Sequence, residues 1–334
     1  MSGDPSFEHE SVLVGEVVEH LSSRDDEVYV DCTLGGGGHS SAIRGRIIGI
    51  DRDPAALAAA GARLGDRAQL VHGSFGDVAS ILAGLGISKV NGFILDLGVS
   101  SPQLDHADRG FSFSKEGPLD MRMDPTRGPT ALDLLQDTET EDLAELISDL
   151  GEERYAKRIA RLIKEAIKED RIHTTTQLAA VVAQGIPVVE QRKSKIHPAT
   201  RTFQALRIAV NSELDQLERF LAAFPDLLLP GGRCAIISFH SLEDRLVKNA
   251  FRDLTWTSSL PPRLAEAEGE RVEPVVELLT KKAVFATDDE VARNPRARSA
   301  RLRACVRTSA PNVPAQRGGF RRSSARDRGS RDDD

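Results

Sequence analysis

Two aspartates and a glycine-rich turn are the residues whose types and spacing are best suited to chemistry in this sequence. Four glycines and a histidine fill residues 35–39, and Asp51 directly follows the apolar segment 47–50. Glycines let the backbone turn sharply and let a ligand approach closely. A carboxylate at the end of a parallel strand can accept hydrogen bonds from both hydroxyls of a ribose. The pattern therefore predicts a binding site for a nucleoside-containing cofactor.

The turn departs from the motif of a dinucleotide-binding site, which limits the kind of nucleoside cofactor that it can bind. A dinucleotide site needs a glycine or alanine three residues after its second glycine, and an acid about twenty residues further on. Ser40 stands at that place here, and Asp51 comes early. A cofactor without a pyrophosphate, such as S-adenosylmethionine, fits better. The competing interpretation, a turn that binds nothing, is less favoured because Asp51 stands at the end of the next strand.

The second aspartate, Asp96, follows the apolar segment 90–95, which reads as a fourth strand. An acid at this place lies at the crevice where such sheets bind ligands. Its carboxylate can accept a hydrogen bond from an exocyclic amine and orient the nitrogen lone pair for attack on a methyl group. The alternative is that Asp96 caps the following turn. Phe75 also has two interpretations, stacking on an adenine or packing in the core.

Apolar, β-branched segments alternate with helical patterns in the first hundred residues, which predicts a parallel sheet covered by helices. Between 104 and 199 this alternation stops, and a long loop with three helical patterns indicates an inserted helical domain. One further helix is expected from about 197 to 224. The expected strands are 28–34, 47–51, 68–72, 90–98 and 233–239, with an antiparallel pair at 276–285 and 300–307, and the three helical patterns are 139–150, 152–169 and 174–183.

Composition is typical of a globular protein of a reducing compartment. The 334 residues carry a formal net charge of −7, and the three cysteines have no spacing typical of metal or redox sites. No apolar segment is long enough to cross a membrane. We therefore expect a cytoplasmic location, no membrane partner and no metal ion. Basic residues gather at 192–207 and 293–307, where a phosphate backbone can dock despite the negative sum.

Several longer motifs resemble those of one bacterial enzyme family. They lie in order between residues 8 and 307, and they include GGGGHS at 35–40, DLGVSSPQLD at 96–105, RGFSF at 109–113 and SFHSLEDR at 238–245. On these motifs the chain is similar to the family of ribosomal RNA small subunit methyltransferase H. Its members methylate N4 of a cytidine in the decoding region of 16S rRNA.

The resemblance implies an α/β fold, a class I S-adenosylmethionine-dependent methyltransferase with a Rossmann-like, mainly parallel seven-stranded sheet and an inserted small helical domain. The methyltransferase domain would comprise residues 1–103 and 200–310, and the helical domain 104–199 would recognise the substrate. The Arg-rich segment 311–334 lies outside the resemblance and is expected to be disordered. The implied partner is 16S rRNA or the small ribosomal subunit, and a homodimer is left open.

The resemblance also implies a set of residues that bind the methyl donor. The role of Asp96 as amine acceptor follows from chemistry rather than from the family. A direct in-line transfer is expected, because N4 becomes nucleophilic once its lone pair is localised, and no cysteine stands at the end of the fourth strand. Only residues 40–46 separate the glycine turn from the second strand, so the helix there should be short. The implied donor-binding residues are Gly37, Gly38, His39, Asp51, Phe75, Asp96 and Gln103.

Three other functions share part of this pattern. A nicotinamide-dependent oxidoreductase would also use the sheet and Asp51. A noncatalytic RNA-binding assembly factor would keep the basic segments without needing Asp96. An amino-methylating DNA enzyme usually carries an Asp/Ser/Asn-Pro-Pro-Tyr/Phe motif after the fourth strand, where this chain reads Asp96-Leu97-Gly98-Val99. The sequence as a whole favours the rRNA methyltransferase.

Overall fold

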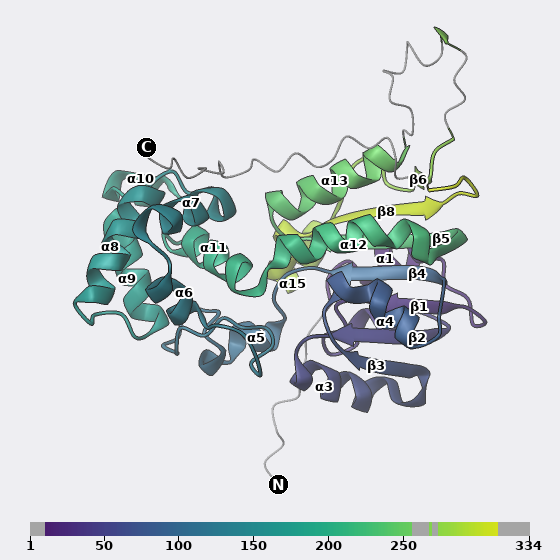
Figure 1. Ribbon diagram of the computed structural model, residues 1–334, viewed down its shortest axis with the longest axis horizontal. Coiled ribbons are helices and arrows are strands. Elements are labelled where there is room, and N and C mark those ends of the chain that lie inside the picture. Colours follow the sequence, from purple (N-terminus) through teal and green to yellow (C-terminus); the bar gives the residue numbers. More distant parts are fainter. Residues whose placement is uncertain (1–10, 256–266, 269–272, 313–334) are drawn as a thin grey trace, which may run out of the picture.

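A twisted sheet with flanking helices and a separate bundle of helices lie side by side in the computed structural model of the chain (Figure 1). The structure describes residues 11–255, 267–268 and 273–312. From residue 313 onward, the segment expected to be disordered lies outside the described residues.

The sheet runs in the order β3-β2-β1-β4-β5-β8-β6, and the two-residue strand β7 also pairs with β8. Within the described ranges it therefore has eight strands, of which seven form the continuous path. The first five strands in this order are parallel to one another, and β8 is antiparallel to β5, β6 and β7. The expected mainly parallel α/β sheet is confirmed, with β7 as an addition. The strands are β1 (Val28–Asp31), β2 (Arg46–Asp51), β3 (Ala68–His72), β4 (Val90–Asp96), β5 (Leu228–Ser238), β6 (Val276–Leu278), β7 (Val284–Phe285) and β8 (Arg301–Arg307).

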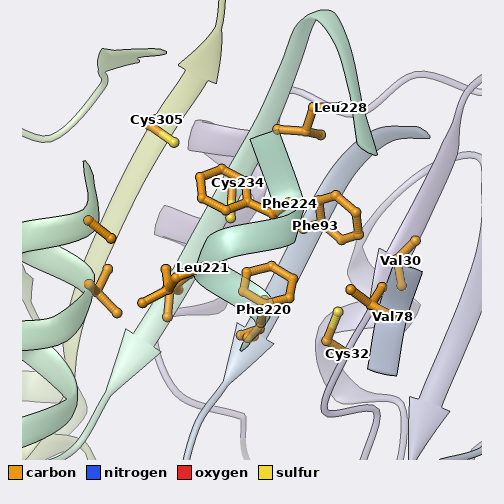
Figure 2. Close-up of a cluster of buried hydrophobic side chains, with 14 of the residues drawn as sticks. Val30, Cys32, Val78, Phe93, Phe220, Leu221, Phe224, Leu228, Cys234 and Cys305 are labelled. Carbon is orange, nitrogen blue, oxygen red and sulfur yellow. The ribbon is translucent and has the colours of Figure 1, made fainter. Parts of the chain in front are cut away.

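Helices cover both faces of this sheet, because successive strand residues point to opposite faces and both faces are apolar. Ile48 packs in the core beneath α12, whereas Ile47 packs in the core beneath α1. Figure 2 shows the first of these cores around Phe220. The flanking helices are α1 (Val14–Leu21), α2 (Gly38–Ala42), α3 (Pro54–Leu64), α4 (Val78–Gly84), α12 (Glu213–Leu227), α13 (Ser241–Thr255) and α15 (Asp288–Arg293).

Three of the parallel strands end in an aspartate. Asp31 is the last residue of β1, Asp51 of β2 and Asp96 of β4. Since β1 pairs in parallel with both β2 and β4, these ends meet at one edge of the sheet. The topology therefore brings the two aspartates singled out from the sequence to the same place.

The bundle has a hydrophobic core of its own. The helical pattern of α8 puts Ile159 and Ile163 inside it, with Lys and Arg on the opposite side. The helices expected at 139–150, 152–169 and 174–183 are confirmed as α7, α8 and α9. The helices that follow β4 are α5 (Ser101–Asp105), α6 (Ala131–Asp137), α7 (Thr140–Gly151), α8 (Ala156–Lys168), α9 (Thr175–Gly185), α10 (Val188–Lys193) and α11 (Thr200–Asn211).

The single helix expected from about 197 to 224 is wrong, because the chain breaks it at Ser212. That residue has a left-handed backbone, with φ 49° and ψ 41°, and it separates α11 from α12. Phe203 of α11 packs in the core of the bundle, whereas Phe220 of α12 packs in the core of the sheet. The cores thus divide the chain near residue 212, and α11 packs with the bundle although the predicted division assigned residues from 200 onward to the sheet domain.

The joint at Ser212 is held by the side chain before it. The amide of Asn211 donates to the backbone oxygen of Met121 at 2.8 Å and accepts from the backbone N–H of Met123 at 2.8 Å. No glycine or proline stands at the break, so the apolar periodicity of the sequence continues across it and gives no sign that the helix ends there. Among the described residues, no helix combines the length and the apolar composition that a membrane crossing requires.

We expect Phe220→Ala to lower the free energy of unfolding by about 3–5 kcal/mol, as is usual for truncating a buried phenylalanine. Phe220 is fully buried, and its ring lies 5.4 Å from that of Phe93 and 5.6 Å from that of Phe224, measured between centroids. Urea denaturation of the purified chain followed by circular dichroism measures the change.

Phe285→Ala is the matched control, because the same atoms are removed from a side chain that is 57% exposed. Its free energy of unfolding should stay within about 0.5 kcal/mol of the unsubstituted chain. Equal losses for the two variants would contradict the assignment of Phe220 to the main core.

Candidate functional site

A pocket opens where the parallel strands end. Its wall contains the glycine turn and both candidate aspartates, Asp51 and Asp96. Phe75 and Gln103 also line it, so six of the seven expected donor-binding residues contribute directly. The complete set of expected residues found in the wall is Gly38, His39, Asp51, Phe75, Asp96 and Gln103.

Gly37 is the expected residue that does not line this pocket. It adopts φ 75° and ends the turn as the N-cap of α2. A Cβ at this position would stand 3.1 Å from Cδ1 of Leu64, beneath the turn. The role visible for Gly37 is therefore to shape the turn, while Gly35, Gly36 and Gly38 face the pocket.

Asp51 holds the start of the glycine turn in place. Its Oδ2 accepts the backbone N–H of Gly35 at 2.8 Å, and its Oδ1 accepts the backbone N–H of Asp53 at 2.8 Å. Burial raises the pKa of Asp51 to about 6, and the two backbone hydrogen bonds act against that rise. Each carboxylate oxygen has a second lone pair, so the group can still accept hydrogen bonds from a ligand in the pocket.

Asp96 differs from Asp51 in having one carboxylate oxygen unused. Its Oδ1 is buried and has no hydrogen-bond partner among the described residues. Its backbone N–H donates to Oγ1 of Thr33 at 2.6 Å, which fixes the end of β4 against β1. Burial raises the pKa of Asp96 to about 6, although the nearby His39 ring acts in the opposite direction. The carboxyl group thus changes its charge close to neutral pH.

His39 packs behind Asp96 and is itself buried. Its Nε2 lies 2.8 Å from the backbone oxygen of Val12, so this nitrogen carries a proton and donates it. Its Nδ1 lies 3.8 Å from Oδ2 of Asp96. In the neutral ring Nδ1 has no proton to donate, so His39 offers Asp96 a charge-assisted contact only when it is protonated.

The polar groups of Gln103 are used within the protein. Its Oε1 accepts the backbone N–H of Ser100 in a capping box at the start of α5. Its Nε2 donates to Oδ2 of Asp53 at 3.2 Å, and Arg109 donates to the same oxygen at 2.7 Å. Phe75, by contrast, presents its ring to the pocket while meeting Phe220 edge to face at 6.4 Å.

Ser40, the residue in the place of a third glycine, has a structural task. Its hydroxyl donates to Oδ2 of Asp31 at 2.6 Å, and both side chains are buried. Burial raises the pKa of Asp31, while this hydrogen bond lowers it. Ser40 therefore fastens α2 to the end of β1 through its side chain, at the place where the third glycine of a dinucleotide site serves close packing of helix and strand.

Sequence reasoning missed part of the wall. Glu213, the first residue of α12, and Glu243, in the first turn of α13, both line the pocket. Glu213 receives two hydrogen bonds from Arg207, at 2.8 and 2.9 Å. Burial would raise the pKa of Glu243, but the adjacent His240 ring and the charges nearby hold it below its usual range. Glu243 stands in the motif at 238–245, but no local signal links it to Glu213, since the two acids stand far apart in the sequence and meet only through the sheet.

Comparison with known proteins agrees with this geometry. The sequence matches the MraW methylase family over residues 6–308. Ribosomal RNA small subunit methyltransferase H of Anaeromyxobacter sp. (strain K) is 52% identical over 314 residues, which cover 91% of this chain and 98% of that protein. The protein of the same name from Trichlorobacter lovleyi is 52% identical over 307 residues, covering 89% of this chain and 97% of that protein.

A third relative, from Sorangium cellulosum, carries the same name and is 52% identical over 307 residues, covering 90% of this chain and 91% of its own length. The glycine turn, the strand-end aspartates and the added helical bundle all lie inside the matched range. The chain therefore belongs to the MraW methylase family and is a methyltransferase that uses S-adenosylmethionine.

Proposed function

We propose that this protein methylates N4 of a cytidine in 16S rRNA, by direct transfer and without a covalent enzyme intermediate. The observation that carries the proposal is the carboxylate of Asp96, which lines the pocket and whose buried Oδ1 has no hydrogen-bond partner among the described residues. Curated relatives that are about half identical over nearly their whole length are named as methyltransferases of small subunit rRNA. Their names support RNA as the substrate of this chain, within the cytoplasm.

The donor supplies an electrophilic methyl group when it is bound. On the protein side, Asp51 accepts hydrogen bonds from the ribose hydroxyls through its remaining lone pairs, and the turn at Gly35 and Gly36 lets the ligand approach the backbone. Phe75 offers its ring to the adenine from the adjoining strand end. Each assignment uses a lone pair or a ring face that the contacts within the protein leave free.

Asp96 acts on the acceptor base. As a carboxylate, its free Oδ1 accepts one hydrogen from the exocyclic amine, which localises the nitrogen lone pair and orients it toward the methyl carbon. The bound donor would supply the methyl group to this nitrogen, and the electron pair of its carbon–sulfur bond would remain on sulfur. The amine then loses one proton, which Asp96 is placed to accept before it passes to solvent.

Cysteine chemistry is not needed for this reaction. Cys32 lines the pocket, but burial and the charge of Asp31 raise the pKa of its thiol well above the usual range, so the thiol stays protonated. Cys234 and Cys305 lie in the core between β5 and β8. A thiolate nucleophile for attack on a pyrimidine carbon is therefore not provided.

We predict that Asp51→Ala weakens binding of S-adenosylhomocysteine about 10- to 100-fold, because hydrogen bonds to a charged group contribute about 1.5–3 kcal/mol. Titration calorimetry with the purified chain measures the change. The exposed Asp66→Ala is the matched control and should bind as the unsubstituted chain does.

A second ligand separates ribose binding from mere distortion of the turn. The unsubstituted chain should bind the 2′,3′-dideoxy analogue of S-adenosylhomocysteine more weakly than the ribose form, and Asp51→Ala should bind the two equally. If the variant still prefers the ribose form, Asp51 does not bind the hydroxyls.

We predict that the rate of methyl transfer falls as the pH drops through about 6, because protonation removes the negative charge with which Asp96 attracts the amine hydrogen. The raised pKa means that Asp96 is neutral below about 6 and charged above it, so activity is retained on the alkaline side. Below the pKa the single-turnover rate should fall about tenfold per pH unit. Asp51 titrates in the same range, so the donor is kept saturating at every pH.

Asp96→Asn should abolish this pH dependence and remain slow at every pH, because an amide is neutral and does not titrate. Asp96→Ala should lower the single-turnover rate about 100-fold or more at pH 8. An unchanged pH profile in Asp96→Asn would assign the titration to another group and remove Asp96 from the mechanism.

The substrate is tested by methyl transfer from isotope-labelled S-adenosylmethionine to small ribosomal subunits that lack the modification. Naked 16S rRNA, tRNA and DNA are assayed in parallel, and the label is located by nucleoside analysis. We expect the label in N4-methylated cytidine from the subunit and little elsewhere. Label at a carbon of the base, or none in any nucleic acid while the donor still binds, would overturn the proposed reaction.

A further inference from the structure

Three side chains from separate parts of the chain meet beside the donor pocket. They are Glu213 at the start of α12, His240 just after β5, and Glu243 in the first turn of α13. One donor atom from each lies within 4.8 Å of the others. The side chains are only 7%, 8% and 3% exposed, respectively, so bulk water has little access to them.

The imidazole of His240 is the unusual member. Its Nε2 is buried and makes no hydrogen bond to any of the described residues, although it lies 3.1 Å from Oε1 of Glu243. A ring N–H at this nitrogen would not be aligned with that oxygen. Two ligands of one metal ion, each about 2.1 Å from it, stand about 3 Å apart, which is the separation seen here. The nitrogen and the oxygen are thus spaced as neighbouring ligands.

Glu243 is held as the ligands of a metal site usually are, by outer hydrogen bonds that leave one oxygen free, whereas each oxygen of Glu213 accepts one hydrogen bond and keeps its second lone pair. Oε2 of Glu243 accepts the backbone N–H of Phe239 at 2.9 Å and that of His240 at 3.3 Å, which leaves Oε1 for another partner. Glu213 is fixed by its two hydrogen bonds from Arg207. The charges of Arg207 and Arg52 both act on Glu213, and that of Arg207 also acts on Glu243.

We propose that Glu213, His240 and Glu243 bind one divalent transition-metal ion, Zn²⁺ or Mn²⁺. Two carboxylates and one imidazole suit these ions, whereas Mg²⁺ favours oxygen ligands alone. The ion would join the starts of α12 and α13 to the end of β5, in the wall of the pocket that also contains Asp96. Further coordination positions would be filled by water or a substrate oxygen. This site goes beyond methyl transfer and differs from the sequence analysis, which expected no metal.

A proton on Nε2 is the competing occupant. Nδ1 of His240 lies 3.4 Å from the backbone N–H of Glu243, a long contact that is compatible with Nδ1 as acceptor and Nε2 as the protonated nitrogen. Metal binding requires the opposite tautomer, with the proton on Nδ1 and the lone pair of Nε2 on the ion. The metal-free and the metal-bound states therefore differ in which nitrogen of the His240 ring carries the proton.

The test uses the full chain after treatment with a chelator, and it needs no methyl transfer. Titration calorimetry with Zn²⁺ alone, and visible absorption on adding Co²⁺ as a spectroscopic probe, should both report one ion per chain. His240→Ala and Glu213→Gln should each weaken Zn²⁺ binding at least tenfold. His173→Ala is the matched control, since that exposed ring lies 3.4 Å from Oδ1 of Asp170 outside the cluster, and it should leave binding unchanged.

Circular dichroism establishes that each variant is folded before its affinity is compared. One readout needs no variant at all, since long-range nitrogen–proton spectra of the unsubstituted chain report the state of the His240 ring. Added Zn²⁺ should move the Nε2 resonance and place the proton on Nδ1. No Zn²⁺ uptake, equal uptake by His240→Ala, or a His240 ring that keeps its proton on Nε2 at saturating Zn²⁺ would each overturn the proposal.

Discussion

The structure depends on bringing three aspartates together at one edge of a parallel sheet, because each must be kept from destabilising the fold. Asp31 is satisfied by the hydroxyl of Ser40, and Asp51 by the backbone N–H groups of Gly35 and Asp53. Burying a carboxylate without such partners is costly, and the raised pKa values of these groups express that cost. The glycine turn therefore does two things at once, since it leaves room for a ligand and turns its N–H groups toward Asp51.

Hydrogen bonds connect the helical bundle to this edge of the sheet. Asp53, two residues after Asp51, accepts hydrogen bonds from Gln103 and Arg109, which lie on the chain leading into the bundle. At the return, Asn211 binds the backbone at Met121 and Met123. These polar links join the segments that form the two hydrophobic cores, and the sheet and the bundle lie side by side (Figure 1).

Unsatisfied buried atoms mark the chemistry of this wall. In the described part of the chain, Oδ1 of Asp96 and Nε2 of His240 are two of the few buried side-chain atoms without a hydrogen-bond partner. A buried polar group without a hydrogen-bond partner lowers the free energy of unfolding by about 1–3 kcal/mol, and the stability of the fold gives no reason to keep it. An amine on the first atom and an ion on the second would each remove that cost. The two proposals thus rest on the same physical argument, applied to different atoms.

The sequence by itself determined the parallel sheet, the glycine turn and the strand-end carboxylates, because β-branched runs, consecutive glycines and a single acid after a strand are local signals. It also determined the family, through motifs such as residues 96–105 and 238–245. Only the tertiary structure decided that the helix breaks at Ser212, since its apolar periodicity continues through a break that the side chain of Asn211 stabilises. The cluster of Glu213, His240 and Glu243 was likewise decided by topology, because the ends of β5, α12 and α13 meet only once the sheet is formed.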